Sequence, residues 1–322
     1  MKIVITGGGG FIGFKLAKAL LARGTLAAEK IARLTLVDQA FPAELPEDPR
    51  LETLAGDISD PSFAARAIEP DTASIFHLAA VVSGAAEADF DLGMRVNLKG
   101  MQNVLDQARR CARPPRLVFA SSVAAFGGQL PHVLDDSTTP APQTSYGSQK
   151  VIGEYLVSDF SRKGYVDGRS LRLPTIVVRP GKANAAASSF ASAAVREPLA
   201  GVAYECPLPP ETGVWLLSPR RVVEAFIHAH DLPASRWGSN RVVNLPGITV
   251  TVAEMIAAMG KIAGSHVAER VSWKLDARID AIVKTWPVRF ATPRALAMGF
   301  KADPGIDAVI RDYIADENVK IA

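Results

Sequence analysis

The fold of this chain is decided by residues 2–13, which read KIVITGGGGFIG. A short apolar run meets a cluster of glycines, and an amphipathic stretch from Ile12 to Arg23 follows. This order predicts a buried strand, a tight turn and a helix. Glycines let such a turn approach a phosphate closely, and the start of the helix supplies free N–H groups and the positive end of its dipole. The alternative is a strand–helix turn without a ligand. We expect the turn to bind the pyrophosphate of a dinucleotide through Gly7, Gly10, Phe11, Ile12 and Gly13.

The first half of the chain repeats this alternation of strand and helix. Short apolar runs bounded by turn residues predict strands covered on both faces, and amphipathic stretches such as 89–110 predict the helices between them. The strands are expected at 3–6, 34–37, 51–55, 74–78 and 117–120. Alternating strands and helices predict an α/β fold with a doubly wound parallel sheet, the Rossmann arrangement.

The second half differs in composition. From about Leu173 onward, prolines at 174, 180, 198, 207, 209 and 210 interrupt a region of small residues. We predict a dinucleotide-binding domain over 1–175 and a smaller C-terminal substrate-binding lobe over 176–322. A predicted helix at 221–230 and a predicted strand at 241–245 indicate that 215–246 returns to the first domain.

Asp38 ends the second predicted strand. A carboxylate there can accept hydrogen bonds from both ribose hydroxyls of an adenosine, and it repels a 2′-phosphate. Neither Gln39 nor Ala40 supplies a compensating cation. A helix N-cap role is the weaker alternative, because Phe41-Pro42 follows. The sequence therefore predicts NAD rather than NADP as the cofactor.

Two further strand ends complete the predicted cofactor site. Asp57 and Ile58 follow the third strand, where the carboxylate can hydrogen-bond an adenine edge. An aspartate that only stabilises a turn is a fair alternative. The fourth strand ends in small residues that suit a wall beside the cofactor: Leu78, Ala79 and Ala80.

Tyr146 and Lys150 are four residues apart, which places them on one face of a helix. Tyrosine is a poor base at neutral pH, but a nearby ammonium favours its phenolate. Tyr146 would take a hydroxyl proton while hydride leaves the same carbon, and Lys150 would also hold the nicotinamide ribose. Ser122 follows a strand and can hydrogen-bond the reacting oxygen of the substrate. Asn97 either supports Lys150 through a backbone or water link or is a polar residue inside a helix.

Composition excludes several classes of protein. The 322 residues are 48% apolar and 21% charged, which predicts a folded chain with a sizeable core. The net charge of +3 is small, and the basic residues at 109, 110, 113 and 116 lack interleaved aromatics, so we expect no nucleic-acid partner. We expect no membrane span and no signal peptide, because no apolar run is long enough and the N-terminus runs directly into the first strand.

Cysteine and histidine usage adds two expectations. Cys111 and Cys206 form no disulfide framework, which fits a reducing compartment and a cytoplasmic protein. His228 and His230 are two apart on a predicted helix and point to opposite sides, so we expect no metal.

The motifs follow the order found in the extended short-chain dehydrogenase/reductase superfamily, which the chain resembles strongly up to about Pro180 and loosely beyond it. Besides the glycine turn and Asp38, they lie at 56–58, 77–80, 96–97, 121–127 and 146–150. The resemblance implies NAD binding, Tyr146 as acid/base, Lys150 as its partner and Ser122 as the third member. It also implies a homodimer joined by helices near 90–110 and 146–163.

Two departures from the superfamily narrow the chemistry. Sugar-nucleotide dehydratases place two acidic residues directly after the catalytic hydroxyl, where this chain has Val123 and Ala124. Sugar-nucleotide epimerases commonly carry an arginine for the diphosphate where this chain has Trp215. Both departures argue against a nucleotide-sugar substrate.

The segment 179–190 resembles that of a superfamily member which oxidises a four-carbon sugar acid at C2. A small polyhydroxy acid needs a cation for its carboxylate and several short donors. Arg179, Asn184 and Ser188 are the candidates, and Ser83 would line the near side. A turn that leaves the sheet, followed by a closely packed helix of small residues, is an equal alternative for these positions.

Three hypotheses about function follow. The first is an NAD-dependent dehydrogenase that acts on a small sugar acid. The second is an epimerase that uses the same residues with tightly held NAD. The third is a non-enzymatic dinucleotide sensor, which ranks last because such proteins usually lack the Tyr–Lys pair.

Overall fold

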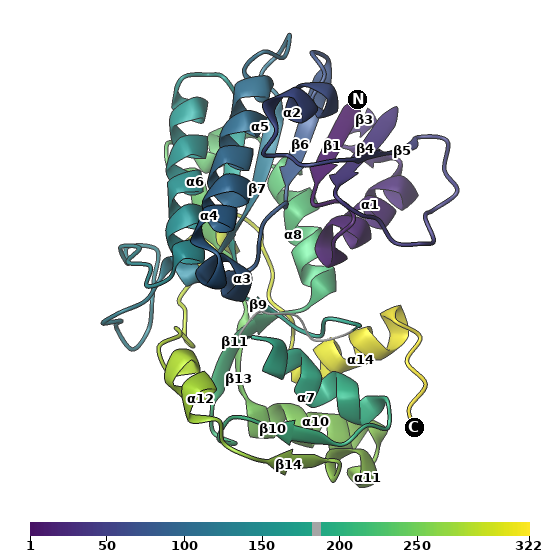
Figure 1. Cartoon of the computed structure of the whole chain (residues 1–322), viewed down its shortest axis with the longest axis vertical. Coiled ribbons are helices and arrows are strands. Elements are labelled where there is room, and N and C mark those ends of the chain that lie inside the picture. Colours follow the sequence, from purple (N-terminus) through teal and green to yellow (C-terminus); the bar gives the residue numbers. More distant parts are fainter. Residues whose placement is uncertain (182–187) are drawn as a thin grey trace. The chain divides into compact units, whose positions relative to one another are not determined.

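The computed structural model describes residues 1–181 and 188–322, and the chain divides into two compact units. The first unit consists of Met1–Ala125, Thr144–Arg172 and Val223–Val243. The second consists of Phe126–Gln143, Leu173–Val222 and Asn244–Ala322. Figure 1 traces the course of the chain through both.

The two largest differences from the expected 1–175 and 176–322, with 215–246 returning, are the segment 126–143 and the start of the return. The segment 126–143 belongs to the second unit, where Leu134 forms a β-bridge with Phe290. The return to the first unit begins at Val223 rather than at 215, because β11 (Gly213–Leu217) pairs with β9 (Thr175–Ile176) and β13 (Ile248–Thr251) of the second unit.

The first unit is built on the doubly wound sheet that the sequence predicts. Its strand order is β12-β8-β7-β6-β1-β4-β5, and β1 pairs in parallel with β4 and β6, as β4 does with β5 and β6 with β7. The bounds are β1 Lys2–Thr6, β4 Arg33–Asp38, β5 Leu51–Ala55, β6 Thr72–His77, β7 Arg116–Ser122, β8 Asp167–Leu173 and β12 Val242–Asn244. All five strands predicted for the first half are therefore present. A small hairpin, β2 (Thr25–Leu26) with β3 (Glu29–Lys30), precedes β4.

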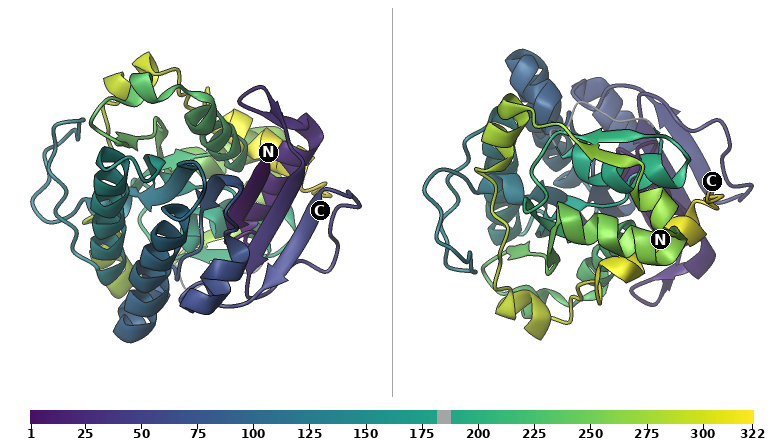
Figure 2. Two further views of the ribbon diagram at one scale, coloured as in Figure 1. Left: turned by 90° about the horizontal axis from the view of Figure 1, so that it is seen from above. Right: turned by 90° about the horizontal axis from the view of Figure 1, so that it is seen from below.

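Helices cover both faces of this sheet. On one face, residues of α2 (Pro61–Ala67), α5 (Gly100–Ala108) and α6 (Ser145–Arg162) share a core cluster with Val4, Ile75 and Leu117 of the strands. Figure 2 shows α5 and α6 side by side. On the other face, Phe226 of α8 (Pro219–Asp231) packs edge-on against Phe76 of β6, and α1 (Phe11–Arg23) contacts β1 and β4. Asp60 caps α2 by accepting from the N–H of Ser62.

The predicted helix at 89–110 is helical without a break from Phe90 to Ala108, but its middle is π-helical. It follows α3 (Ser83–Ala88) and consists of α4 (Phe90–Gly93), a π-helix over Met94–Lys99 and then α5. π-Helical turns are rare and often occur at functional sites. The short helices η2 (Val123–Ala125) and α9 (Ala234–Trp237) complete this unit.

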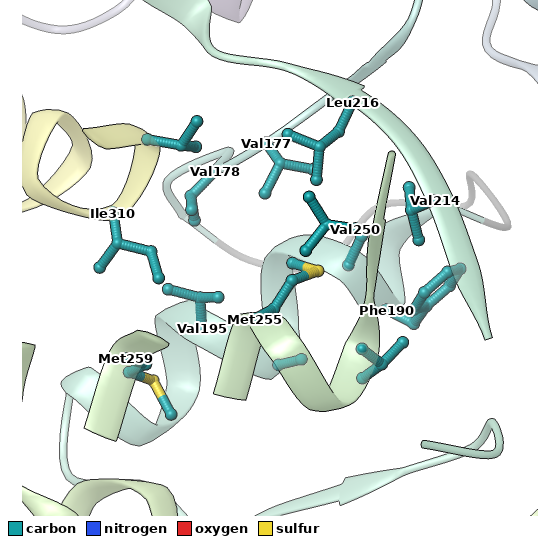
Figure 3. Packing of buried hydrophobic residues seen from close by; sticks show 14 of the residues in the cluster. Val177, Val178, Phe190, Val195, Val214, Leu216, Val250, Met255, Met259 and Ile310 are labelled. Atoms are coloured by element: carbon teal, nitrogen blue, oxygen red, sulfur yellow. The ribbon is translucent and has the colours of Figure 1, made fainter. Parts of the chain in front are cut away.

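The second unit has small sheets and short helices around its own core. β10 (Tyr204–Cys206) pairs in parallel with β14 (Val271–Trp273). The helices are α7 Ser189–Leu199, α10 Val252–Ala263, α11 Ser265–Ala268, α12 Ala277–Val283, α13 Pro293–Ala297 and α14 Ile306–Asp316. Figure 3 shows how Phe190 and Val195 of α7 pack with Met255 of α10 and Ile310 of α14. Within the described ranges, no helix has both the length and the apolar composition that a membrane span needs.

Candidate active site

The candidate site lies at the point where the strand order of the sheet reverses. β1 lies between β4 and β6, so the connections that leave its two sides run in opposite directions. In doubly wound sheets this switch point opens a crevice at the carboxyl ends of the strands, where ligands bind. The glycine turn follows β1 and Leu78 follows β6, and the N–H of Leu78 donates to the carbonyl of Thr6 at 3.0 Å.

Backbone contacts require glycine at two positions of the turn. Gly7 has a φ of +73°, and a Cβ there would lie 2.6 Å from the nitrogen of Ala79. A Cβ on Gly13 would lie 2.1 Å from the carbonyl oxygen of Gly7. Gly10 begins α1 without a side-chain cap, so the first N–H groups of the helix, from Phe11 onward, remain available to an anion.

The carboxylate of Asp38 is held at the edge of the glycine turn. Its Oδ2 accepts from the backbone N–H of Gly9 at 3.0 Å, and its Oδ1 accepts from that of Gln39 at 2.7 Å. Asp38 is partly exposed. The acid is therefore placed beside the backbone of the glycine turn, with acceptor capacity left for a further donor.

The structure separates the roles of Asp57 and Ile58. Asp57 Oδ1 accepts from the N–H of Ser59 at 2.8 Å, which is a turn contact. Ile58 is only 5% exposed and packs in the core cluster of the first unit. The side chain of Ile58 therefore fills the core, and the expected contact of Ile58 with the cofactor stays a prediction.

The first turn of α6 positions Tyr146. Thr144 caps this helix by accepting from the N–H of Gly147 at 3.1 Å, and Tyr146 is the second residue of the helix. Ser122, at the end of β7, lies close enough to the Tyr146 hydroxyl to lower the pKa of that group. Burial raises the pKa of Tyr146 to about 12, and this effect is larger than that of Ser122.

Lys150 lies one turn further along α6 and is buried. Its Nζ donates to the carbonyl oxygen of Ala120 at 2.8 Å, and it lies 5.4 Å from the ring centroid of Tyr146 and 4.8 Å from that of Phe119. Burial lowers the pKa of Lys150 to about 7, while the charge of Glu154 raises it. The sequence suggests that Lys150 lowers the pKa of Tyr146. In the structure the pKa of Tyr146 is instead raised, because burial outweighs the effect of Ser122.

Asn97 lies in the π-helix and joins three elements. Its Oδ1 accepts from the N–H of Val81 at 2.7 Å, and its Nδ2 donates to the carbonyl of Val81 at 3.1 Å and to Oε1 of Gln149 at 2.7 Å. Gln149 precedes Lys150 in α6. These contacts link Asn97 to Lys150 through its chain neighbour and hold the segment that contains Ala79 and Ala80 beside α6.

Sequence reasoning missed a buried ionic group behind Lys150. Glu154, one further turn along α6, accepts from Nε and Nη2 of Arg172 at 2.8 and 2.7 Å and from the hydroxyl of Ser121. The spacing of Glu154 from Lys150 is a readable i,i+4 signal. Arg172 lies on β8, and only tertiary packing brings it there.

The sequence also offered no separate indication that His77 is a site residue. Its ring stacks on Phe119 at 5.7 Å between centroids, and its Nδ1 shares a hydrogen bond of 2.7 Å with the hydroxyl of Thr6. Burial, and then the charge of Lys150, lower the pKa of His77 to about 3. A neutral imidazole therefore lies close to the buried ammonium.

The proposed substrate residues fall in both units. Ser83 begins α3 in the first unit and is partly buried. Ser188 precedes α7 in the second unit and is also partly buried. Asn184 lies outside the described residues.

Arg179 belongs to the second unit and is held by its backbone. Its N–H donates to the hydroxyl of Ser192 at 3.0 Å, and its carbonyl accepts from Nη1 of Arg196 at 2.9 Å. Among the described residues its own buried Nη1 has no hydrogen-bond partner, and burial and the charge of Arg196 lower its pKa. The guanidinium therefore keeps donor capacity for an anion. In the parts of the chain that the structure describes, no group of three or more His, Cys, Asp or Glu residues is arranged to hold a metal.

A parallel sheet with a glycine turn at its switch point and a Tyr–Lys pair beside it defines a protein of the extended short-chain dehydrogenase/reductase class. The model of the NAD dependent epimerase/dehydratase family matches residues 3–233. The chain belongs to this family.

The relatives extend this likeness over nearly the whole chain. A D-erythronate dehydrogenase of Cupriavidus necator is 55% identical over 320 residues, which cover 98% of each chain. A D-erythronate dehydrogenase of Haemophilus influenzae is 44% identical and covers 98% of this chain and 99% of its own. The crystal structure of a nucleoside-diphosphate-sugar epimerase from Agrobacterium tumefaciens superposes with a TM-score of 0.95 at 39% identity, over 100% of this chain and 96% of that one.

Proposed function

We propose that this protein is an NAD-dependent dehydrogenase that oxidises the C2 hydroxyl of a small sugar acid, D-erythronate, to the 2-oxo acid. The observation that carries the proposal is the near full-length similarity to two proteins named for this substrate. The Ser122–Tyr146–Lys150 group supplies the chemistry that this reaction needs.

The described residues fit an NAD molecule. The glycine turn has no space for side chains at Gly7 and Gly13, as a cradle for a pyrophosphate requires, and the start of α1 offers free N–H groups. Asp38 would accept from the adenosine ribose, Asp57 from the adenine edge, and Leu78, Ala79 and Ala80 would form the wall beside it. Lys150 would donate to the nicotinamide ribose. When bound, NAD accepts the hydride that leaves C2.

The chain's own residues manage the proton. Ser122 and Tyr146 would both hydrogen-bond the C2 hydroxyl, and Tyr146 accepts its proton as the carbonyl forms. Because burial raises the pKa of Tyr146 to about 12, positive charge must stabilise its phenolate. Lys150 supplies such charge beneath the ring while it remains protonated.

Arg179 is the proposed cation for the substrate carboxylate. Its buried Nη1, which no described residue contacts by a hydrogen bond, supports this role, since an arginine in such a place gains most from an anionic partner. Ser188, Asn184 and Ser83 are proposed as short donors and acceptors for the remaining hydroxyls of a four-carbon acid.

We further propose a homodimer formed through α5 and α6. Ile152 and Tyr155 of α6 are 40% and 68% exposed, and large apolar side chains on one helix face are typical of an interface. Cys111 and Cys206 are free thiols, in keeping with the proposed cytoplasmic location. Light scattering on the purified protein gives the oligomeric state directly.

An epimerase is the second candidate, favoured by the close structural likeness to the nucleoside-diphosphate-sugar epimerase of Agrobacterium tumefaciens. An epimerase returns its hydride to the substrate and therefore makes no net NADH. Trp215, buried at 7% exposure and stacked on Phe290 at 5.2 Å, stands where nucleotide-sugar epimerases commonly carry an arginine. An indole offers a diphosphate no charge.

The experiment that separates the candidates is NADH absorbance on a panel of four- to six-carbon sugar acids, with NAD and NADP in parallel. Turnover with NAD on D-erythronate or a close relative is expected. If no acid gives NADH while the protein binds NAD and epimerises a nucleotide sugar, the epimerase replaces the dehydrogenase as the proposed function.

A further inference from the structure

Three consecutive residues at the end of β7 are held by the catalytic face of α6. The carbonyl of Ala120 accepts from Lys150, the hydroxyl of Ser121 donates to Glu154, and Ser122 lies close enough to Tyr146 to lower the pKa of its hydroxyl. Two of these contacts use residues already assigned to the reaction. The third uses Glu154, which has no assigned role.

Glu154 is a buried carboxylate in a fixed position. It is 3% exposed, and Arg172 binds both of its oxygens in a bidentate ion pair. Its place on α6, four residues after Lys150, puts it on the same helix face as the ammonium. Neutralising Arg172 does not by itself require a carboxylate on the face of α6 that carries Lys150.

The charged and titratable groups around Lys150 come from three elements besides β7. Tyr146 and Glu154 lie on α6, His77 on β6, and Arg172 reaches Glu154 from β8. Burial keeps His77 neutral near pH 7 by lowering its pKa to about 3, and β7 contributes only the Phe119 ring and a carbonyl. Glu154 is therefore the negative charge in this group when Tyr146 is protonated.

We propose that Glu154 is a positioning residue that keeps the buried Lys150 protonated and holds Ser121, and with it Ser122, against α6. The inference rests on the proposed dehydrogenase chemistry, in which Lys150 must carry charge to stabilise the phenolate of Tyr146. Arg172 orients Glu154, and its positive charge weakens the electrostatic effect of Glu154 at Lys150.

Substitutions of the two partners of this ion pair should have opposite effects. Glu154→Gln keeps the shape but removes the charge, so the pKa of Lys150 should fall by about one unit or more. Arg172→Met leaves the carboxylate unneutralised, so the pKa of Lys150 should rise. If Glu154 served only to satisfy Arg172, the double variant Glu154→Gln/Arg172→Met would recover both stability and the Lys150 titration of the wild type.

The test is a ¹³C NMR titration of protein labelled at the lysine ε-carbon. The signal of Lys150 is assigned by its absence from the spectrum of Lys150→Met. The expected result is a lowered Lys150 pKa in Glu154→Gln that persists in the double variant. Ser121→Ala is the control for this titration, since it removes a hydrogen bond to Glu154 but no charge. A Lys150 pKa in the folded Glu154→Gln or double variant equal to that of the wild type would overturn the proposal.

Turnover gives the second readout. Since Lys150 loses its proton as pH rises, the alkaline limb of the kcat profile should move to lower pH in Glu154→Gln by the shift seen in the titration. The NMR experiment needs neither NAD nor substrate. A shifted Lys150 pKa without turnover on any sugar acid would therefore contradict the proposed function while supporting the role of Glu154.

Discussion

Asp38 Oδ2 accepts the backbone N–H of Gly9 at 3.0 Å, which joins the carboxylate at the end of β4 to the glycine turn after β1. One acidic side chain thus contacts the backbone of the turn that we propose to bind the pyrophosphate, and it lies where the proposal places the adenosine ribose.

We expect Asp38→Asn to weaken discrimination between the two coenzymes. The amide oxygen can still accept from Gly9, but the charge that repels a 2′-phosphate is gone. Charged hydrogen bonds contribute about 1.5–3 kcal/mol, so kcat/KM with NAD should fall roughly tenfold or more. Adding Gln39→Arg should raise kcat/KM with NADP. Steady-state kinetics with both coenzymes checks this, and unchanged selectivity in the double variant would contradict it.

Gly13→Ala and Gly10→Ala form a matched pair in the turn. A Cβ at position 13 would lie 2.1 Å from the Gly7 carbonyl oxygen, whereas at position 10 the nearest atom is 3.2 Å away. Gly13→Ala should therefore cost about 1–3 kcal/mol or more of unfolding free energy, and Gly10→Ala less than about 1 kcal/mol. Urea denaturation measures both. Equal losses would show that the turn adjusts to either methyl group.

Tyr146→Phe should lower kcat by about 10²- to 10⁴-fold, because the substrate proton loses its acceptor. Binding of NAD should be retained, since the ring and Lys150 remain. Tyr155→Phe is the control on the same helix, where the side chain is 68% exposed. NADH formation and a fluorescence titration with NAD separate the two effects. Full turnover by Tyr146→Phe would rule out this mechanism.

Lys150→Met should stabilise the protein while it abolishes turnover. Burial lowers the pKa of Lys150 from 10.5 to about 7, so between these pH values the unfolded chain binds more protons than the folded one. Wild-type stability therefore rises with pH across this window, and the penalty is greatest below pH 7. The advantage of Lys150→Met should be largest at pH 6.5 and shrink by pH 10. Urea denaturation at both pH values measures the difference in stability between Lys150→Met and the wild type. A difference that is the same at both would contradict this prediction.

Arg179→Met should raise KM for the sugar acid. The lost charge-assisted bonds correspond to roughly 10- to 150-fold in kcat/KM. The uncharged amide of the same acid is the control, because its turnover should change little. An equal loss on acid and amide would mean that Arg179 supports the second unit rather than the carboxylate.

Much of the cofactor site could be predicted from local spacing. The strand–glycine–helix order, Asp38 at a strand end and the four-residue step from Tyr146 to Lys150 each depend on neighbours in the chain. The parallel sheet followed from the alternation of elements and is present with all five strands predicted for the first half. The relatives bear out the family that these motifs indicated.

Other features depended on residues that are distant in sequence. Ile58 follows a strand end as Asp57 does, yet its side chain fills the core, because α2 and α5 pack over it. The segment 126–143 belongs to the second unit because Leu134 meets Phe290 there.

The sequence by itself determined the parallel sheet and the glycine turn, and it predicted Tyr146 and Lys150 as a catalytic pair, since each depends on periodicity or short spacing. Only the tertiary structure decided the ionisation of that pair. Burial raises the pKa of Tyr146 and lowers that of Lys150, and Glu154 opposes the shift of Lys150 from a position fixed by Arg172 on a distant strand. Desolvation depends on everything packed around a group, and no local pattern in the chain encodes it.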